Sequence, residues 1–240
     1  MVSEQEPTPR AARTGIPRQA ALVKYFVMTF VEFSILRLVS GRGDWYRAWV
    51  YVAIKLGAQM AVGQIILRKH PDLLAERSRM QQGTKSWDKW LAVLVALVGP
   101  MSMWVVAALE ARWIWPLRVG IGYSLAGFVV CLLGIVLTAW AMISNRFFAA
   151  TVRIQEDRGQ VVVDQGPYGY VRHPGYVGAL VFTLASPIAM GSWYALIPAA
   201  FTATVLVVRT ALEDGTLKAE LAGYAEYAGR VRARLIPGIW

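Results

Sequence analysis

The stretch VGIGYSLAGFVVCLLGIVLTAWAMIS, residues 119–144, decides the fold class of this chain. It contains no charged side chain and exceeds the roughly 20 apolar residues that a transmembrane helix needs. Hydrophobic residues make up 56% of the sequence, and the mean hydropathy is +0.43. Soluble chains of this length normally space their apolar residues along one helix face or on alternate strand positions. The sequence therefore predicts a helical membrane protein.

Five further apolar stretches accompany this one, at residues 21–40, 45–67, 90–109, 176–190 and 193–208. Together they predict an all-α, polytopic bundle of about five or six transmembrane helices. Only Gly191 and Ser192 separate the last two stretches, which predicts a tight hairpin of short helices. Such short helices are tolerated at membrane depth where they pack against protein or line a cavity.

The basic residues predict how the bundle is oriented. They gather before the first stretch, between the second and third, after the fourth and in the tail, whereas the alternate loops carry only Arg42, Arg47, Arg112 and Arg118. Cytoplasmic loops carry the excess of Lys and Arg, so we expect an integral protein of a bacterial inner (plasma) membrane with both termini in the cytoplasm. The net charge of +10 then indicates contact with membrane lipids, not with nucleic acid.

The chain divides into two parts. Residues 1–19 are rich in Pro, Arg and Thr and lack an apolar core, which predicts a disordered cytoplasmic arm without a cleavable signal peptide. Residues 20–240 form one membrane domain. Its single cysteine, Cys131, lies inside an apolar run and is expected to be a small buried core residue. The only two histidines, His70 and His173, fall in different loops, so no metal site is expected.

Three charged residues, Glu32, Arg37 and Lys55, fall inside the first two apolar stretches. Ionisable groups at membrane depth are costly and often functional, but they also pair with one another or extend toward the membrane surface. We favour the interpretation that these residues pair with one another or extend toward the membrane surface. Glu32 and Arg37 are nevertheless five residues apart, which is poor spacing for a pair on one helix face.

The segment GPYGYVRHPGYVG, residues 166–178, is the first of two that interrupt the apolar pattern with chemically useful groups. Arg172 and His173 come immediately before a predicted helix that starts near Pro174. A helix start offers unpaired N–H groups and arginine adds a bidentate contact, so this arrangement suits a carboxylate or another anion. The segment's tyrosines can enclose a purine or ribose. An interfacial anchor, which also uses Tyr and Arg, accounts for the composition equally well.

The tail from residue 209 is the second such segment, and it predicts a cytoplasmic helix. Arg209, Glu213, Glu220 and Tyr224 follow at steps of four, seven and four, on roughly one helix face, and Arg209 with Glu213 has the spacing of an i, i+4 ion pair. A solvated amphipathic helix with ordinary ion pairs is the simpler reading. Gly215 weakens the helix, and a break at that residue is compatible with the pattern.

The chain resembles the isoprenylcysteine carboxyl methyltransferases and their bacterial relatives in the order of four elements. These are GPYGYVRHPGYVG, a helical hairpin, Arg209 with Glu213-Asp214, and LAGYAEY (residues 221–227). That superfamily also includes phospholipid N-methyltransferases. Residues 70–90 and 140–145 are similar to the bacterial branch, and the resemblance covers residues 68–240.

The resemblance implies that S-adenosylmethionine binds in a cytoplasm-facing pocket formed by about residues 145–240. Carried over by position, the residues implied to bind it are Gln160, Val161, Val162, Tyr168, Arg172, His173, Pro174, Tyr176, Gly178, Glu213, Glu220 and Tyr224. Glu213 would hold the cofactor, and Arg209, the second implied catalytic residue, would face the methyl acceptor. Relatives usually have histidine where this chain has Gln160, and their paired glutamates appear here as Glu213-Asp214.

The implied reaction is methyl transfer to a lipophilic acceptor, an isoprenylcysteine-like carboxylate or another lipid, that enters sideways from the bilayer. A sulfonium methyl is already activated, so positioning and charge complementarity would supply most of the rate. An amine acceptor would instead need a base, for which Glu213 or Glu220 is the candidate.

Two alternatives remain. Membrane sterol and steroid reductases have a similar Arg-His-Pro-x-Tyr loop and a tail like LIPGIW, residues 235–240, but they bind NADPH. Arg209 with Glu213 and the LAGYAEY element fit the methyltransferases better. A non-enzymatic membrane binder or transporter is the other alternative, and it predicts no methyl incorporation into any lipid.

Overall fold

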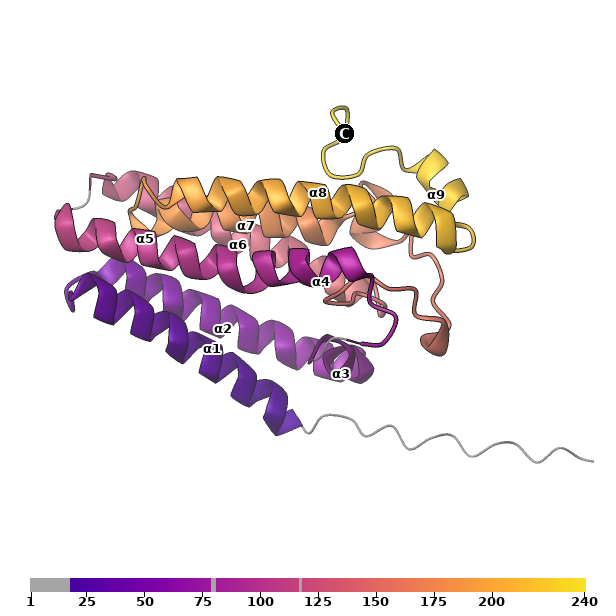
Figure 1. Cartoon of the computed structure of the whole chain (residues 1–240), viewed down its shortest axis with the longest axis horizontal. Coiled ribbons are helices and arrows are strands. Elements are labelled where there is room, and N and C mark those ends of the chain that lie inside the picture. The colour runs from indigo at the N-terminus through magenta and orange to yellow at the C-terminus, as the bar shows by residue number, and fades with distance from the viewer. Residues whose placement is uncertain (1–17, 79–80, 117) are drawn as a thin grey trace, which may run out of the picture.

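The structure, a computed structural model, describes residues 18–78, 81–116 and 118–240. These residues form an elongated helical bundle without a strand (Figure 1). The predicted arm, residues 1–19, lies outside the described residues except for its last two positions, which begin the first helix. The helices are α1 (Arg18–Ser40), α2 (Tyr46–Lys69), α3 (Pro71–Ser78), α4 (Ser86–Val93), α5 (Gly99–Trp113), α6 (Ile121–Ser144), α7 (Pro174–Met190), α8 (Leu196–Glu220) and α9 (Tyr224–Arg230).

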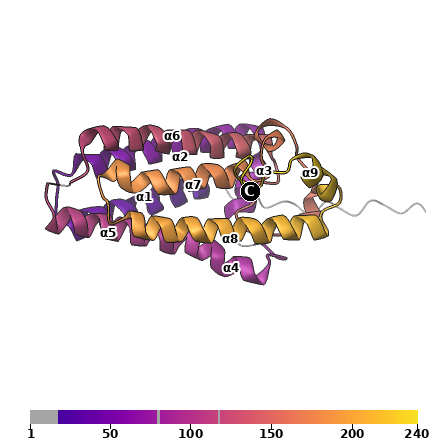
Figure 2. The ribbon, with the colours of Figure 1, turned by 90° about the horizontal axis from the view of Figure 1, so that it is seen from above.

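The all-α membrane fold is confirmed. Within the described residues four segments are long and apolar enough to cross a membrane, namely α2, the run from α4 to α5, α6 and α8, and α7 is a shorter apolar helix. A π-helical turn, Leu94–Val98, joins α4 to α5 without interrupting that run. The chain is therefore an integral membrane protein, with the expected short helix α7 held inside the bundle between α6 and α8 (Figure 2).

The prediction for the last apolar stretch was wrong at its end. Helix α8 does not stop at residue 208 or break at Gly215 but continues to Glu220. A single glycine costs a helix only about 1 kcal/mol relative to alanine, and the flanking Ala, Leu, Lys and Glu residues are good helix formers. The extension matters because Arg209, Glu213 and Asp214 all lie on this one rigid helix.

Close backbone contact fixes α7 against α6. A Cβ atom on Gly178 would lie 2.3 Å from Thr138 Oγ1 and 2.6 Å from the Gly134 carbonyl oxygen, so only glycine fits there. A Cβ on Gly127 would lie 2.6 Å from the backbone nitrogen of Ala189. Small residues of this kind let membrane helices approach closely. Helix α7 therefore has a fixed depth, which places its N-terminus and the loop before it.

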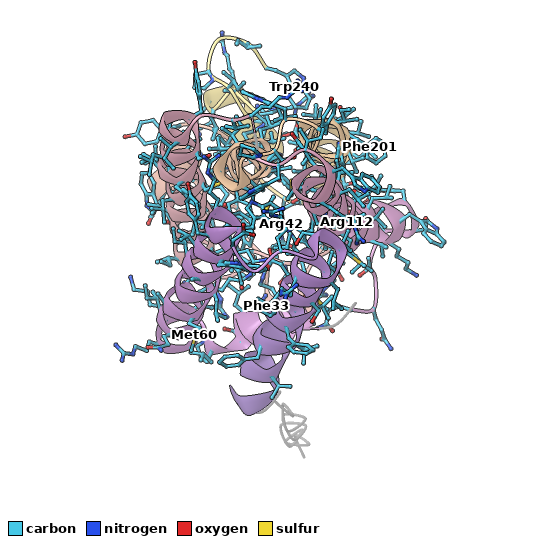
Figure 3. The ribbon with its side chains drawn as sticks, turned by 90° about the vertical axis from the view of Figure 1, so that its left-hand side faces the viewer. Phe33, Arg42, Met60, Arg112, Phe201 and Trp240 are labelled. Atoms are coloured by element: carbon cyan, nitrogen blue, oxygen red, sulfur yellow. The ribbon has the colours of Figure 1, made fainter. Side chains whose placement is uncertain are left out.

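Helices α1 and α2 form one side of the bundle, seen end-on in Figure 3. Glu32 on α1 forms an ion pair with Lys55 on α2, so the partner of Glu32 is not Arg37. The reason is geometric: a neighbouring helix brings Lys55 alongside, whereas Arg37 points elsewhere on α1. Cys131 is buried, as expected for a small core residue.

The loops alternate between two ends of the bundle. At one end Arg112 donates a hydrogen bond to the Val39 carbonyl oxygen, and Arg47 donates one to the Val119 carbonyl oxygen. The loops that carry few charges therefore lie together at this end. The opposite end holds α3, residues 145–173 and α9 (Figure 1). The basic loops therefore meet at the same end as both chemically useful segments.

Candidate active site

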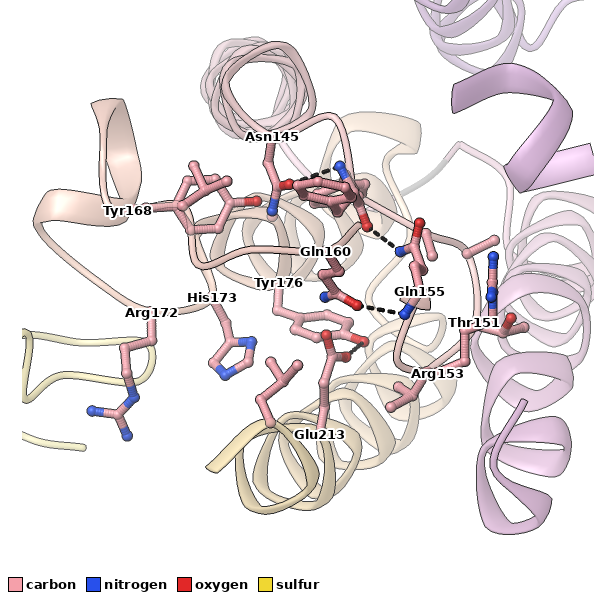
Figure 4. Close-up of a pocket in the computed structure, with 18 of the residues that line it drawn as sticks. Asn145, Thr151, Arg153, Gln155, Gln160, Tyr168, Arg172, His173, Tyr176 and Glu213 are labelled. Atoms are coloured by element: carbon pink, nitrogen blue, oxygen red, sulfur yellow. Dashed lines mark hydrogen bonds between the residues drawn. The ribbon is translucent and has the colours of Figure 1, made fainter. Parts of the chain in front are cut away.

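A cavity of about 310 Å³ opens at the end of the bundle that holds residues 145–173. Its walls come from the π-helical turn, α6, α7, α8, α9 and the long loop between α6 and α7 (Figure 4). Most of the sequence-predicted site residues line it: Gln160, Val161, Val162, Tyr168, Arg172, His173, Tyr176, Arg209, Glu213 and Tyr224. The fold thus brings residues 166–178 and the tail from residue 209 together around one cavity.

Three predicted residues do not line this cavity. Pro174 is the first residue of α7, where its missing N–H costs nothing, and Gly178 is used in the contact with α6. Glu220 ends α8, and its carboxylate accepts from Lys85 Nζ at 2.7 Å near the protein surface. Helix geometry and packing account for the positions of Pro174 and Gly178, and the ion pair with Lys85 accounts for that of Glu220.

Arg209 has a different partner from the one its spacing predicted. Its Nε and Nη2 donate to the Asp88 carboxylate at 2.6 and 3.0 Å, and Nη2 also donates to the Ala150 carbonyl oxygen at 2.8 Å. Asp88 is fully buried on α4 and also accepts the backbone N–H of Val152. Within the described chain, Nη1 is the one guanidinium nitrogen of Arg209 that donates no bond. Arg209 is therefore held rigidly with one donor group left for a molecule in the cavity.

Glu213 lies one turn further along α8 and is bonded to α7 instead of Arg209. Its Oε2 accepts a hydrogen bond of 2.5 Å from the Tyr176 hydroxyl. The ring of Tyr176 lies 5.6 Å from the Arg209 guanidinium carbon. Tyr176 thus lies between the anion and the cation of α8, and all three side chains line the same cavity. Figure 4 shows Tyr176 beside Glu213.

Asp214, the residue next to Glu213, holds a buried network that forms the cavity's outer wall. Its Oδ1 accepts from Arg172 Nε at 2.7 Å and from the Tyr224 hydroxyl at 3.1 Å, and lies 3.3 Å from His173 Nε2. Its Oδ2 accepts from Arg172 Nη2 and from Arg234 Nε at 3.0 and 2.9 Å. The fully buried Asp214 therefore joins the loop before α7, helix α8, helix α9 and the tail at one point.

The same network changes what Arg172 can do. Its Nη1 donates to the carbonyl oxygens of Val231 and Arg232 at 2.8 and 2.7 Å, so every guanidinium nitrogen is engaged within the chain. Burial alone would lower the pKa of Arg172, but the hydrogen bonds and charge of Asp214 raise it. Burial and the neighbouring Asp214 also raise the pKa of Tyr224. Arg172 thus stays charged and holds the tail against α8.

The loop over the cavity is fixed by its own polar side chains. Gln160 Oε1 accepts the backbone N–H of Gln155 at 2.7 Å, and Gln155 Nε2 donates to the Phe147 carbonyl oxygen at 2.7 Å (Figure 4). Arg153 forms an ion pair with Glu76 of α3 at 2.8 Å, and this hydrogen-bonded contact raises the pKa of Arg153. Gln160, the departure from the family pattern, therefore shapes the loop besides lining the cavity.

Sequence reasoning missed several lining or supporting residues, of which Asp88 is the most important. It lies just before the apolar stretch 90–109, and hydropathy, which predicts that stretch, gives no signal for a single carboxylate at its edge. An acid at the membrane boundary, on the same side of the membrane as Arg209, is the signal that could have found it. Val95, Ala96, Thr138 and Leu206, which also line the cavity, carried no signal because they look like ordinary membrane-helix residues.

Residues 125–219, from α6 through α8, match the model of the isoprenylcysteine carboxyl methyltransferase family. Over these residues the chain resembles that family. The match includes α7, the loop before it and most of α8, which hold Tyr176, Arg209 and Glu213, but not Asp88 or Tyr224.

A solved structure extends the likeness to nearly the whole chain. The eukaryotic intramembrane Ras methyltransferase, an isoprenylcysteine carboxyl methyltransferase, aligns with a TM-score of 0.62 over 92% of this chain and 84% of its own, at 20% sequence identity. At that identity the likeness shows a shared fold. None of the curated proteins matches the sequence significantly. The chain thus resembles membrane methyltransferases in its fold and in the segment around the cavity, and neither finding supports the reductase or the non-enzymatic alternative.

Proposed function

We propose that this protein transfers a methyl group from S-adenosylmethionine to a lipophilic acceptor, with an isoprenylcysteine-like carboxylate as the first candidate. One observation carries the proposal: a single cavity joins polar groups of the loop and of α8 to apolar side chains at membrane depth, namely Val95, Ala96, Ala179 and Leu206. Such a cavity suits a polar cofactor at one end and a lipid tail at the other.

The residues around the polar end fit this cofactor. Glu213 Oε1 accepts no hydrogen bond within the described chain, and a carboxylate in a poorly hydrated cavity favours a cation such as a sulfonium or ammonium group. Tyr168 and Tyr176 line the same cavity, and their rings are suited to packing against a purine or ribose. Arg172 is committed to Asp214, so its expected contact with the cofactor carboxylate is replaced by a role in holding the wall.

The proposed mechanism rests on positioning. The bound cofactor supplies a methyl group that is already activated as a sulfonium. Arg209, locked by Asp88, directs its unused Nη1 donors at an acceptor carboxylate, and Glu213, oriented by Tyr176, balances positive charge on the other side. No general base is needed for a carboxylate acceptor, because it is already ionised at neutral pH.

The lipid acceptor would enter from the bilayer between helices, and the cofactor from the aqueous end. We assign that end to the cytoplasm, with both termini on the same side, because the basic loops meet there. Addition of prenylated peptides to right-side-out and inside-out membrane vesicles tests the assignment.

Incubation of the purified chain with labelled S-adenosylmethionine and native membranes tests the function directly. A carboxyl methyl ester releases labelled methanol on mild base treatment, whereas a methylated amine keeps its label. We expect base-labile product in the lipid or prenyl-peptide fraction. The absence of any labelled product, or tight NADPH binding without S-adenosylmethionine binding, overturns the proposal.

A matched pair of variants tests the role of Glu213. Glu213→Gln removes the charge in the cavity and is expected to weaken S-adenosylmethionine binding about 10- to 100-fold, the value of one charge-assisted hydrogen bond. Glu226→Gln makes the same change on the exposed face of α9 and should leave affinity unchanged. Equal affinities for both variants would exclude Glu213 from the cofactor site. Binding is measured by equilibrium titration.

A further inference from the structure

A second, strongly basic groove lies on the outer side of the Asp214 network. Its volume is about 330 Å³, and four of its lining side chains are cationic: Arg172, Lys218, Arg232 and Arg234. Ala228 and Trp240 complete the lining. Arg172 is the residue that this groove shares with the candidate active site. Neither the family match nor the proposed methyl transfer gives the groove a role.

The charges in this groove are not balanced from within. Asp214 is the carboxylate that contacts the cations, at 2.7 Å from Arg172, 2.9 Å from Arg234 and 3.2 Å from Lys218. Arg232 is exposed, and its guanidinium has no ionic partner within the described chain. Several cations around one carboxylate leave a net positive groove that attracts an anion with several oxygens.

The depth of the groove in the bundle indicates which anion it meets. The backbone N–H groups of Arg172 and His173 donate to the carbonyl oxygens of Ala233 and Arg234, at 2.9 and 3.0 Å. The next residue begins the apolar helix α7. The tail is therefore fastened at the level where the apolar part of the bundle starts, and it runs back along the outside of α7 and α8 (Figures 1 and 2). At that level a bilayer presents its headgroups.

The tip of the tail is suited to the same surface. Ile236 is 51% exposed and Ile239 is 78% exposed, in a turn that projects from the bundle (Figure 1). Trp240 packs beside them, its ring 4.7 Å from the Arg234 guanidinium carbon. Exposed isoleucines with a tryptophan and arginines form the pattern of a segment that sits at a membrane interface. The apolar tip and the basic groove are continuous along residues 231–240.

We propose that this groove binds the phosphate of an anionic phospholipid headgroup, with Lys218, Arg232 and Arg234 contacting the phosphate and the Ile236–Ile239 turn lying among the acyl chains. Arg172 remains bound to Asp214 and supplies fixed charge behind the phosphate. Because Arg172 also lines the active-site cavity, the lipid occupies the outer face of the wall whose inner face borders the cofactor.

The test is lipid binding, so it stands apart from methyl transfer. The full chain in neutral detergent is titrated with short-chain phosphatidylglycerol, short-chain phosphatidylcholine or inorganic phosphate. We expect phosphatidylglycerol to bind at least about tenfold more tightly than either of the others, because the groove offers three contacting cations and the tip an apolar surface. Equal affinity for the two lipids, or equal affinity for inorganic phosphate, overturns the proposal.

Two charge-matched series locate the site. Arg232→Gln and Arg232→Glu should weaken phosphatidylglycerol binding about 5-fold and about 25-fold, at about fivefold for each unit of charge near the surface. Arg230→Gln and Arg230→Glu make the same changes two residues earlier, where Arg230 pairs with Asp164 outside the groove. These controls should change affinity less than twofold. Equal losses in both series would indicate general surface charge and overturn the site. Both positions are exposed, so each of the four variants is expected to keep the parent's unfolding midpoint.

Discussion

Two fully buried carboxylates, Asp214 and Glu32, occupy opposite situations in this bundle. Asp214 contacts three cations, a histidine and a tyrosine from four parts of the chain. Glu32 contacts one cation, Lys55, on the neighbouring helix. Around Glu32 the buried Thr29 Oγ1 and Trp104 Nε1 lack hydrogen-bond partners within the described residues. Asp214 thus belongs to a fully hydrogen-bonded network that shapes a site, whereas Glu32 belongs to a single ion pair that joins two helices.

Removing the Asp214 charge should have the largest effect. Asp214→Asn leaves the Arg172 and Arg234 guanidiniums without their counter-ion, and a stranded buried charge costs about 3–5 kcal/mol. We expect a large fall in the thermal unfolding midpoint and rapid proteolysis of the tail after residue 230, because the network fastens it.

Asp164→Asn is the control for this change. It removes one carboxylate from the exposed pair with Arg230, in which the side chains are 44% and 69% exposed, and should cost less than about 1 kcal/mol. If Asp214→Asn is as mild as this control, the network is not what holds the tail.

The Glu32–Lys55 pair should behave differently when both partners are removed. Glu32→Leu alone leaves Lys55 unpaired and is expected to destabilise the bundle by about 3 kcal/mol. Glu32→Leu with Lys55→Met should return stability to within about 1 kcal/mol of the parent, since an isolated buried pair is often replaceable by apolar residues. A double-mutant cycle on unfolding midpoints measures this coupling. A double variant as unstable as the single one would give the pair a role beyond joining α1 and α2.

This contrast also explains what the sequence could and could not predict. Hydropathy located the apolar part of each long membrane helix in the described chain, although it ended α8 too early, and the motif around His173 indicated one half of the cavity. Both signals are local. The partners of Glu32 and Arg209 were not predictable from spacing, because Lys55 and Asp88 reach them from other helices. Asp214 was noted only as a departure from paired glutamates. Its cluster includes Arg172 and Arg234, 42 and 20 residues away, and no local pattern records such contacts.

Packing around glycines was equally invisible to the sequence, and Gly178 shows why. It was assigned to the cofactor site from its place in the motif, yet a Cβ there would overlap Thr138 on α6. Gly215 was expected to weaken α8, yet it lies within continuous helix and a Cβ there would meet nothing within 4 Å. The same residue type is required at one position and dispensable at the other, and only the neighbouring helix distinguishes them.

The smallest expected effect follows from Gly215, which adjoins Asp214 on α8. Gly215→Ala should stabilise the protein by about 0.5–1 kcal/mol, because alanine loses less backbone freedom on folding and fits without contact. Gly178→Ala is the opposite control and should destabilise by about 1–3 kcal/mol through overpacking. The unfolding midpoints of both variants show whether the two substitutions have opposite effects on stability. If Gly215→Ala destabilises the protein, α8 must bend locally beside Asp214. That result would contradict the inference that one rigid helix holds Arg209, Glu213 and the tail network.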